Sequence, residues 1–190
     1  MKLVDRILKK SEQPWYTAIV FIMTIFESIF LFIPPEVFMT PAIVANKKRV
    51  IPITMAAAIG SIIGGLITYM IGLWLFDTVG IWLIEHFATM DKFELTKILF
   101  NKYGIMIIIL TAVTPVPYKL LALCAGFLHY PIAIFLGVSA IFRTGRFAIV
   151  GFLLWCFQKQ ANEIVKKYSW QITIAAIIFA LLGLLIITVI

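Results

Sequence analysis

Two long stretches of this chain contain no charged residue at all. They cover residues 50–76 and 169–190, and each reaches the length of about 20 apolar residues that a helix needs to cross a bilayer. Hydrophobic residues make up 63% of the 190 residues and charged residues only 13%. A soluble domain of this length would have too few polar residues to cover so much apolar surface. The sequence therefore predicts an all-α integral membrane protein.

Two further apolar stretches, 15–45 and 103–128, are each broken near the middle by proline. Proline removes a backbone hydrogen-bond donor and disfavours helix at the residue before it, so each stretch divides into two half-helices. We expect each to enter the bilayer, turn and leave by the same side, as a re-entrant hairpin buried in protein or facing water. Pro41 interrupts the first stretch again. The residues predicted to make the two turns are Pro34, Pro35, Pro115 and Pro117.

The other segments complete a single membrane domain over residues 1–190. Residues 131–157 are long enough to span a bilayer, although they contain two arginines. In 77–102 apolar residues alternate with acids and lysines, which predicts an amphipathic helix along the membrane surface. Residues 1–13 do not resemble a cleaved signal, and they fit an interfacial amphipathic helix and a solvated tail equally well.

The placement of positive charge supports this arrangement. With a cytoplasmic N-terminus and hairpins that return to their own side, basic residues concentrate inside, as the positive-inside rule demands, and the C-terminus lies on the opposite side. Making both broken stretches full spans would place residues 47–49 outside. The ten basic residues inside are Lys2, Arg6, Lys9, Lys10, Lys47, Lys48, Arg49, Lys159, Lys166 and Lys167, and the three outside are Lys92, Lys97 and Lys102.

The broken stretches and the spans that follow them form an internal repeat with a constant offset of 81 residues (34 to 115, 64 to 145, 74 to 155). Each repeat is a hairpin followed by one full span, so the second repeat starts on the opposite face and the two are related by inversion. Many secondary transporters share this architecture and bind substrate where broken helices meet near the midplane. The matched pairs are Pro34 with Pro115, Gly64 with Gly145, and Trp74 with Trp155.

Five ionisable residues lie within apolar stretches, where each charge costs roughly 2.5–3.5 kcal/mol at a bilayer centre. Together they imply mutual pairing or a wet cavity. Their surplus of positive charge suits an anionic ligand such as a phosphate headgroup, which arginine binds through paired hydrogen bonds. The alternative is that they only pair with one another and hold the hairpins together. The five are Glu27, Glu36, Lys119, Arg143 and Arg146.

Small residues predict close helix packing. The run GSIIGG places Gly60 and Gly64 at the spacing that lets helix backbones approach, with Gly65 one residue further. Gly145 is the repeat partner of Gly64 and is expected to pack in the same way.

The sequence contains no cluster of cysteine and histidine residues of the kind that binds a metal. The two cysteines form no CxxC or Cys/His cluster, and His86 and His129 are isolated, so we predict no metal and no cofactor. The net charge of +7 would indicate nucleic acid only in a soluble protein. No paired His/Asp, Ser/Lys or metal-ligand set appears, so the chain is not predicted to be an enzyme.

Two motifs resemble those of the DedA family, whose members carry a VTT domain and are also called SNARE-associated Golgi proteins. FESIFLFIPPEV resembles its first re-entrant motif, with one acid ahead of a proline-rich turn and a second just after it. TPVPYKLLALCAGFLHYPIAIFLGVSAIFRTGRFAIVGFLLW resembles its second half, most closely in the bacterial YqaA-like branch. The family usually has an arginine just after the second turn, where this chain has Lys119, a point charge without arginine's fork.

The resemblance implies two opposed re-entrant hairpins and lipid transport in a bacterial inner membrane. The partners expected from it are phospholipid or polyprenyl phosphate, with protons as a coupling ion. We predict a flippase or scramblase in which Lys119, Arg143 and Arg146 hold the phosphate, while Glu27 and Glu36 pair with these bases or carry protons. The alternative hypothesis is a proton-coupled carrier of a small soluble ion or solute. A pure scaffold is a further alternative, and the sequence assigns no oligomeric state.

Overall fold

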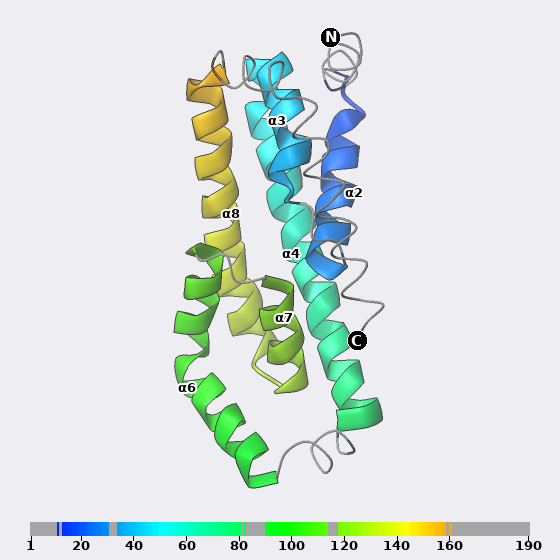
Figure 1. Cartoon of the computed structure of the whole chain (residues 1–190), viewed down its shortest axis with the longest axis vertical. Helices are drawn as coiled ribbons and strands as arrows, with labels where there is room; N and C mark the ends of the chain where they lie inside the picture. The colour runs from blue at the N-terminus through cyan, green and yellow to red at the C-terminus, as the bar shows by residue number, and fades with distance from the viewer. Residues whose placement is uncertain are drawn as a thin grey trace. The chain divides into compact units, whose positions relative to one another are not determined.

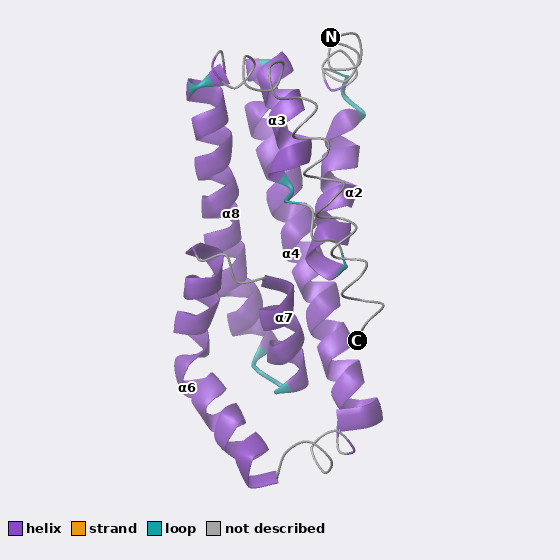
Figure 2. Ribbon diagram, in the orientation of Figure 1, coloured by secondary structure: helices purple, strands orange, loops and turns teal. Residues whose placement is uncertain are grey.

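The computed structural model describes residues 11, 13–30, 34–80, 82, 90–113, 118–158 and 160. Within them every regular element is helical and none is a strand, which confirms the predicted all-helical class (Figure 2). The expected span over 169–190, most of 1–13, and both Pro115 and Pro117 lie outside the described residues. The helices are α2 (Tyr16–Ile29), α3 (Glu36–Ala45), η1 (Lys47–Arg49), α4 (Val50–Leu75), η2 (Phe76–Gly80), α6 (Met90–Val113), α7 (Tyr118–Phe127) and α8 (Ile132–Cys156).

Local chemistry accounts for both ends of α3. The helix begins at Glu36 directly after Pro35, because proline's fixed φ suits helix entry and an acid in the first turn complements the helix dipole. It ends before Asn46, whose backbone is extended and whose side chain accepts a hydrogen bond of 3.0 Å from the Lys48 amide. Pro41, which interrupts the same apolar stretch in the sequence, lies inside α3 and does not end it. Its neighbours Met39, Ala42 and Ile43 are fully buried, so their packing keeps this turn helical.

Among the described residues, two stretches are long and apolar enough to cross a membrane, Lys47–Thr78 and Ile132–Cys156. Both present large apolar side chains at the surface, and Ile51, Ile141 and Ile149 are 72%, 70% and 62% exposed. Water would penalise exposed apolar surface of this kind, whereas lipid does not. Length, composition and exposed apolar side chains together indicate a membrane protein.

The chain divides into two compact units, which share α4 and α8 between them. The first unit contains residues 1–61 and 147–190. In it α2 and α3 run antiparallel (Figure 1), and the Ser11 hydroxyl, which precedes α2, donates to the Pro41 carbonyl in α3 at 3.1 Å. The buried residues of its core are Val20, Met39, Ala42, Ile43, Ile53, Ala57, Ala58 and Phe147.

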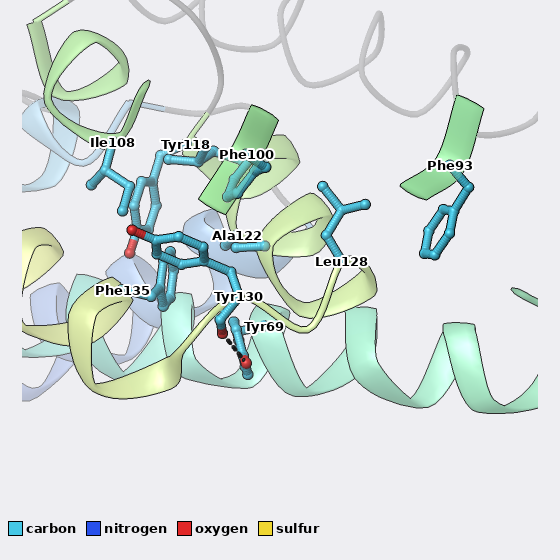
Figure 3. Close-up of a cluster of buried hydrophobic side chains, with 11 residues drawn as sticks. Tyr69, Phe93, Phe100, Ile108, Tyr118, Ala122, Leu128, Tyr130 and Phe135 are labelled. Atoms are coloured by element: carbon cyan, nitrogen blue, oxygen red, sulfur yellow. Dashed lines mark hydrogen bonds between the residues drawn. The ribbon is translucent and has the colours of Figure 1, made fainter. Parts of the chain in front are cut away.

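The second unit contains residues 62–146, with α6, α7 and parts of α4 and α8. Its core is rich in aromatic residues (Figure 3), and the Tyr69 hydroxyl on α4 donates to the Tyr130 carbonyl at 2.6 Å. The expected boundary between residues 102 and 103 falls inside α6, which runs unbroken through it. No proline stands there, and Gly104 packs its bare Cα against the Tyr130 ring, so nothing ends the helix. The described core residues are Tyr69, Phe93, Phe100, Ile108, Tyr118, Leu121, Ala122, Ala125, Leu128, Tyr130 and Phe135.

Candidate functional site

The five predicted site residues divide between the two units. Glu27 on α2 and Glu36 at the start of α3 belong to the first unit, and both are half-buried. The three bases belong to the second unit. The predicted pairing of acids with bases therefore stays a prediction, and each half of the candidate site is described by itself. The bases are Lys119 on α7 and Arg143 and Arg146 on α8.

Glu27 lies in a small buried polar cluster. The Ser28 hydroxyl donates to Glu27 Oε2 at 3.3 Å and lies 3.4 Å from the Ser61 hydroxyl on α4. Both serines are buried. They reach each other because α2 and α4 approach closely at Gly60, where an added Cβ would lie 2.6 Å from the Phe21 carbonyl oxygen. A carboxylate that accepts a hydrogen bond from a buried hydroxyl is suited to exchanging protons or pairing with a base.

Arg143 is the most deeply buried of the bases, at 3% exposure. Its guanidinium carbon lies 4.3 Å from the centre of the Tyr118 ring, which α7 supplies. The Tyr118 ring runs nearly parallel to that of Phe135, with 6.1 Å between their centres (Figure 3). Lys119, the residue after Tyr118, and Arg146, one turn after Arg143, are half-buried. The second unit thus places a buried cation against the face of one aromatic ring.

Glycine creates the space for this arrangement at Gly65. An added Cβ there would lie 2.5 Å from the Tyr118 hydroxyl oxygen, so only glycine leaves room for the ring. Gly64 beside it is buried, and its carbonyl accepts a hydrogen bond of 2.9 Å from the Thr68 hydroxyl. At Gly145 an added Cβ would meet no atom within 4 Å in the described part of the chain. The packing role predicted for Gly145 has no support there.

A close helix crossing in the second unit was missed by the sequence reasoning. An added Cβ at Gly126 on α7 would collide with the Tyr69 carbonyl of α4, and one at Gly72 with the Leu123 carbonyl. The two backbones touch through a glycine from each helix. The only available signal was the Ala125-Gly126 pair, and nothing in the sequence matches it to Gly72.

A second missed residue is Arg49, counted only as a cytoplasmic charge. It is buried, and its guanidinium donates to the Ser11, Gln13 and Pro14 carbonyls and to the Thr17 hydroxyl. It therefore anchors the chain entering α2. No group of three or more His, Cys, Asp or Glu side chains that could hold a metal occurs among the described residues.

Comparison with known proteins places these features in a family. The VTT domain model matches residues 33–157, which include the first proline turn and all three bases but not Glu27. An uncharacterized protein of Haemophilus influenzae is 28% identical over 168 residues, covering 86% of this chain and 85% of that protein. An uncharacterized protein of Histophilus somni is 30% identical with the same coverage. No solved structure matches the chain.

Proposed function

The chain belongs to the VTT domain family, also called the DedA family, and on that premise we propose that it moves a phosphate-bearing lipid headgroup across a bacterial inner membrane. Membership in this family supports a transporter-like role in a membrane. In the proposal the protein is a flippase or scramblase: the headgroup passes through a polar cavity while the lipid tails stay in the bilayer.

The observation that carries the proposal is the burial of Arg143. A guanidinium at 3% exposure on a helix long enough to cross a membrane is costly to insert, and a structural protein would gain more from an apolar residue there. Arginine is also the side chain best matched to phosphate, because its fork donates two parallel hydrogen bonds. Lys119 and Arg146 would add charge for the same phosphate.

The helix lengths support the proposed inverted repeat. Helices α3 and α7 have ten residues each, and α7 begins 82 residues after α3 (36 to 118). Helices α4 and α8 have 26 and 25 residues, with the same offset between their starts (50 to 132). Each short helix follows a proline-rich segment and precedes a long helix. We propose that these are two re-entrant hairpins of opposite orientation, with the N-terminus of the chain in the cytoplasm.

The acids complete the proposed mechanism. Glu27 and Glu36 would neutralise the bases when no lipid is bound, and would release them or take up protons when phosphate arrives. The buried hydroxyls of Ser28 and Ser61 next to Glu27 favour a proton-carrying role for this acid. The same cluster is the reason to keep a proton-coupled carrier of a soluble solute as the second candidate.

Proteoliposomes test the function directly. Purified protein is reconstituted with fluorescent phosphatidylglycerol or polyprenyl phosphate, and the fraction of probe that crosses the bilayer is followed over time. We expect the wild type to move lipid and Arg143→Ala to slow it by about tenfold or more. Lys102→Ala, which removes an exposed cation, is the matched control. Lipid movement no faster than in empty vesicles would refute the proposal. Solute uptake that depends on Glu27, in the absence of lipid movement, would favour the proton-coupled carrier of a soluble solute.

A further inference from the structure

The contact between Tyr118 and Arg143 joins two helices at a buried point of the second unit. Tyr118 opens α7, and Arg143 lies in the middle of α8. Both side chains are buried, and the guanidinium carbon sits 4.3 Å from the ring centre. At this distance the positive charge interacts with the negative face of the ring, and the interaction is strongest where water is excluded.

This contact is compatible with phosphate binding because it uses a different part of the guanidinium. Stacking on an aromatic ring engages the flat face of the group, whereas a bidentate phosphate contact engages its edge. A ring against the face therefore fixes the plane of the fork without competing for the hydrogen bonds that a phosphate would take. Such pre-organisation lowers the ordering cost of binding.

The surroundings of Tyr118 are built to hold the ring in one position. Gly65 on α4 leaves the space that the hydroxyl end of the ring occupies. Phe135 on α8 lies nearly parallel to the ring, with 10° between the planes. The space at Gly65 on α4 and the Phe135 ring on α8 thus restrict the orientation of the Tyr118 ring.

We propose that Tyr118 is a positioning residue, which holds the Arg143 guanidinium by its face so that its edge is presented to the phosphate of the lipid. Gly65 is part of the same device because it makes room for the ring. The inference rests on the proposed function in one respect, namely that Arg143 binds phosphate. It adds that Tyr118, an uncharged residue next to Lys119 in the sequence, determines how tightly the phosphate is bound.

The test compares two substitutions that differ only in keeping the ring. Translocation is measured at increasing mole fractions of the phosphate lipid, which gives a half-saturating fraction and a maximal rate for each variant. Tyr118→Phe keeps the ring and should stay within about twofold of the wild type, whereas Tyr118→Leu should raise the half-saturating fraction by about tenfold. Gly65→Ala, which displaces the ring without altering it, should shift in the same direction as Tyr118→Leu.

Tyr103→Leu is the matched control, because Lys102 Nζ lies 5.2 Å from the centre of that ring but the ring is 46% exposed. It should behave as the wild type. A Tyr118→Leu variant with an unchanged half-saturating fraction would overturn the inference, and so would a Tyr118→Phe variant as impaired as Tyr118→Leu. If Tyr118→Leu does not fold, the half-saturating fraction and maximal rate of Gly65→Ala decide between the same two outcomes.

A second measurement separates this inference from the proposed function. A double-mutant cycle of Tyr118→Leu and Arg143→Met on unfolding in detergent needs no transport. Non-additive effects support the contact even if the wild type moves no lipid, in which case only the proposed function falls. Strictly additive effects contradict the positioning role even if Arg143→Ala abolishes transport.

Discussion

The Arg49 guanidinium donates a hydrogen bond of 2.8 Å to the carbonyl oxygen of Ser11, 38 positions earlier in the chain. It also donates to the Thr17 hydroxyl at 2.5 Å. One side chain from η1 thus holds the chain on both sides of the start of α2. A charge that the positive-inside rule explains by topology alone also has a structural role in the first unit.

Replacing Arg49 should therefore cost more than replacing its exposed neighbour. Arg49→Lys keeps the charge but loses the fork that reaches several carbonyls, and we expect a loss of about 1.5–3 kcal/mol in the free energy of unfolding. Lys48→Ala, at an exposed position, should change it little. Denaturant titration in detergent measures both. Equal effects of the two substitutions would mean that Arg49 acts only through its charge.

Glycine-to-alanine substitutions should destabilise the protein where α7 crosses α4 and should be tolerated on the open face of α8. Gly126→Ala puts a methyl group into the Tyr69 carbonyl, a backbone atom that cannot rotate away, and should destabilise the protein by about 3 kcal/mol. Gly145→Ala and Gly137→Ala add a methyl group where nothing lies within 4 Å in the described structure. They should be neutral or stabilise α8 by up to about 1 kcal/mol. A thermal unfolding series that ranks Gly145→Ala with Gly126→Ala would contradict this.

His129 ends α7 in the left-handed region, with φ of 55°. The Tyr130 amide donates to the Ala125 carbonyl and the His129 amide to the Gly126 carbonyl, the bonds of a Schellman motif, in which glycine is preferred at this position. The ring packs edge-on against Phe76, and Asp77 lies 4.0 Å away in an exposed pair.

The backbone conformation gives an ordering of His129 variants. His129→Gly should be more stable than His129→Ala by about 1 kcal/mol. Both variants lose the ring contact, but only alanine is strained in the left-handed conformation. Asp77→Asn should change stability little, since exposed ion pairs contribute little. Unfolding midpoints of the three variants check the order, and an alanine variant at least as stable as the glycine variant would contradict it.

The serine cluster should matter for transport through Glu27. Ser28→Ala removes the hydroxyl that donates to the carboxylate, and we expect lipid movement to fall about two- to tenfold. Thr78→Ala is a suitable control, because this exposed hydroxyl bonds only carbonyls of its own helix turn. Initial rates in proteoliposomes, at matched protein content, measure both. Transport by Ser28→Ala at the wild-type rate would remove Ser28 from the mechanism.

Local sequence patterns predicted much of the helical framework. The apolar stretches gave two membrane-length helices, and the pair Pro34-Pro35 precedes the start of α3. Sequence alone could not show that α3 continues through Pro41, because that depends on the packing of three buried neighbours. The sequence reasoning also divided α6 where the composition changes from charged to apolar, although a change of composition does not end a helix without proline or a cap.

The sequence by itself determined that this chain is helical, that it is apolar enough for a bilayer, and that it carries ionisable residues within its apolar stretches. These properties are sums over neighbouring residues, so they can be read without knowing which helices meet. Only the tertiary structure decided that Arg143 stacks on Tyr118, that Gly126 meets Tyr69, and that Arg49 reaches back to Ser11. Each of these contacts joins residues more than twenty positions apart, and a close approach of two backbones depends on the angle and height at which their helices cross.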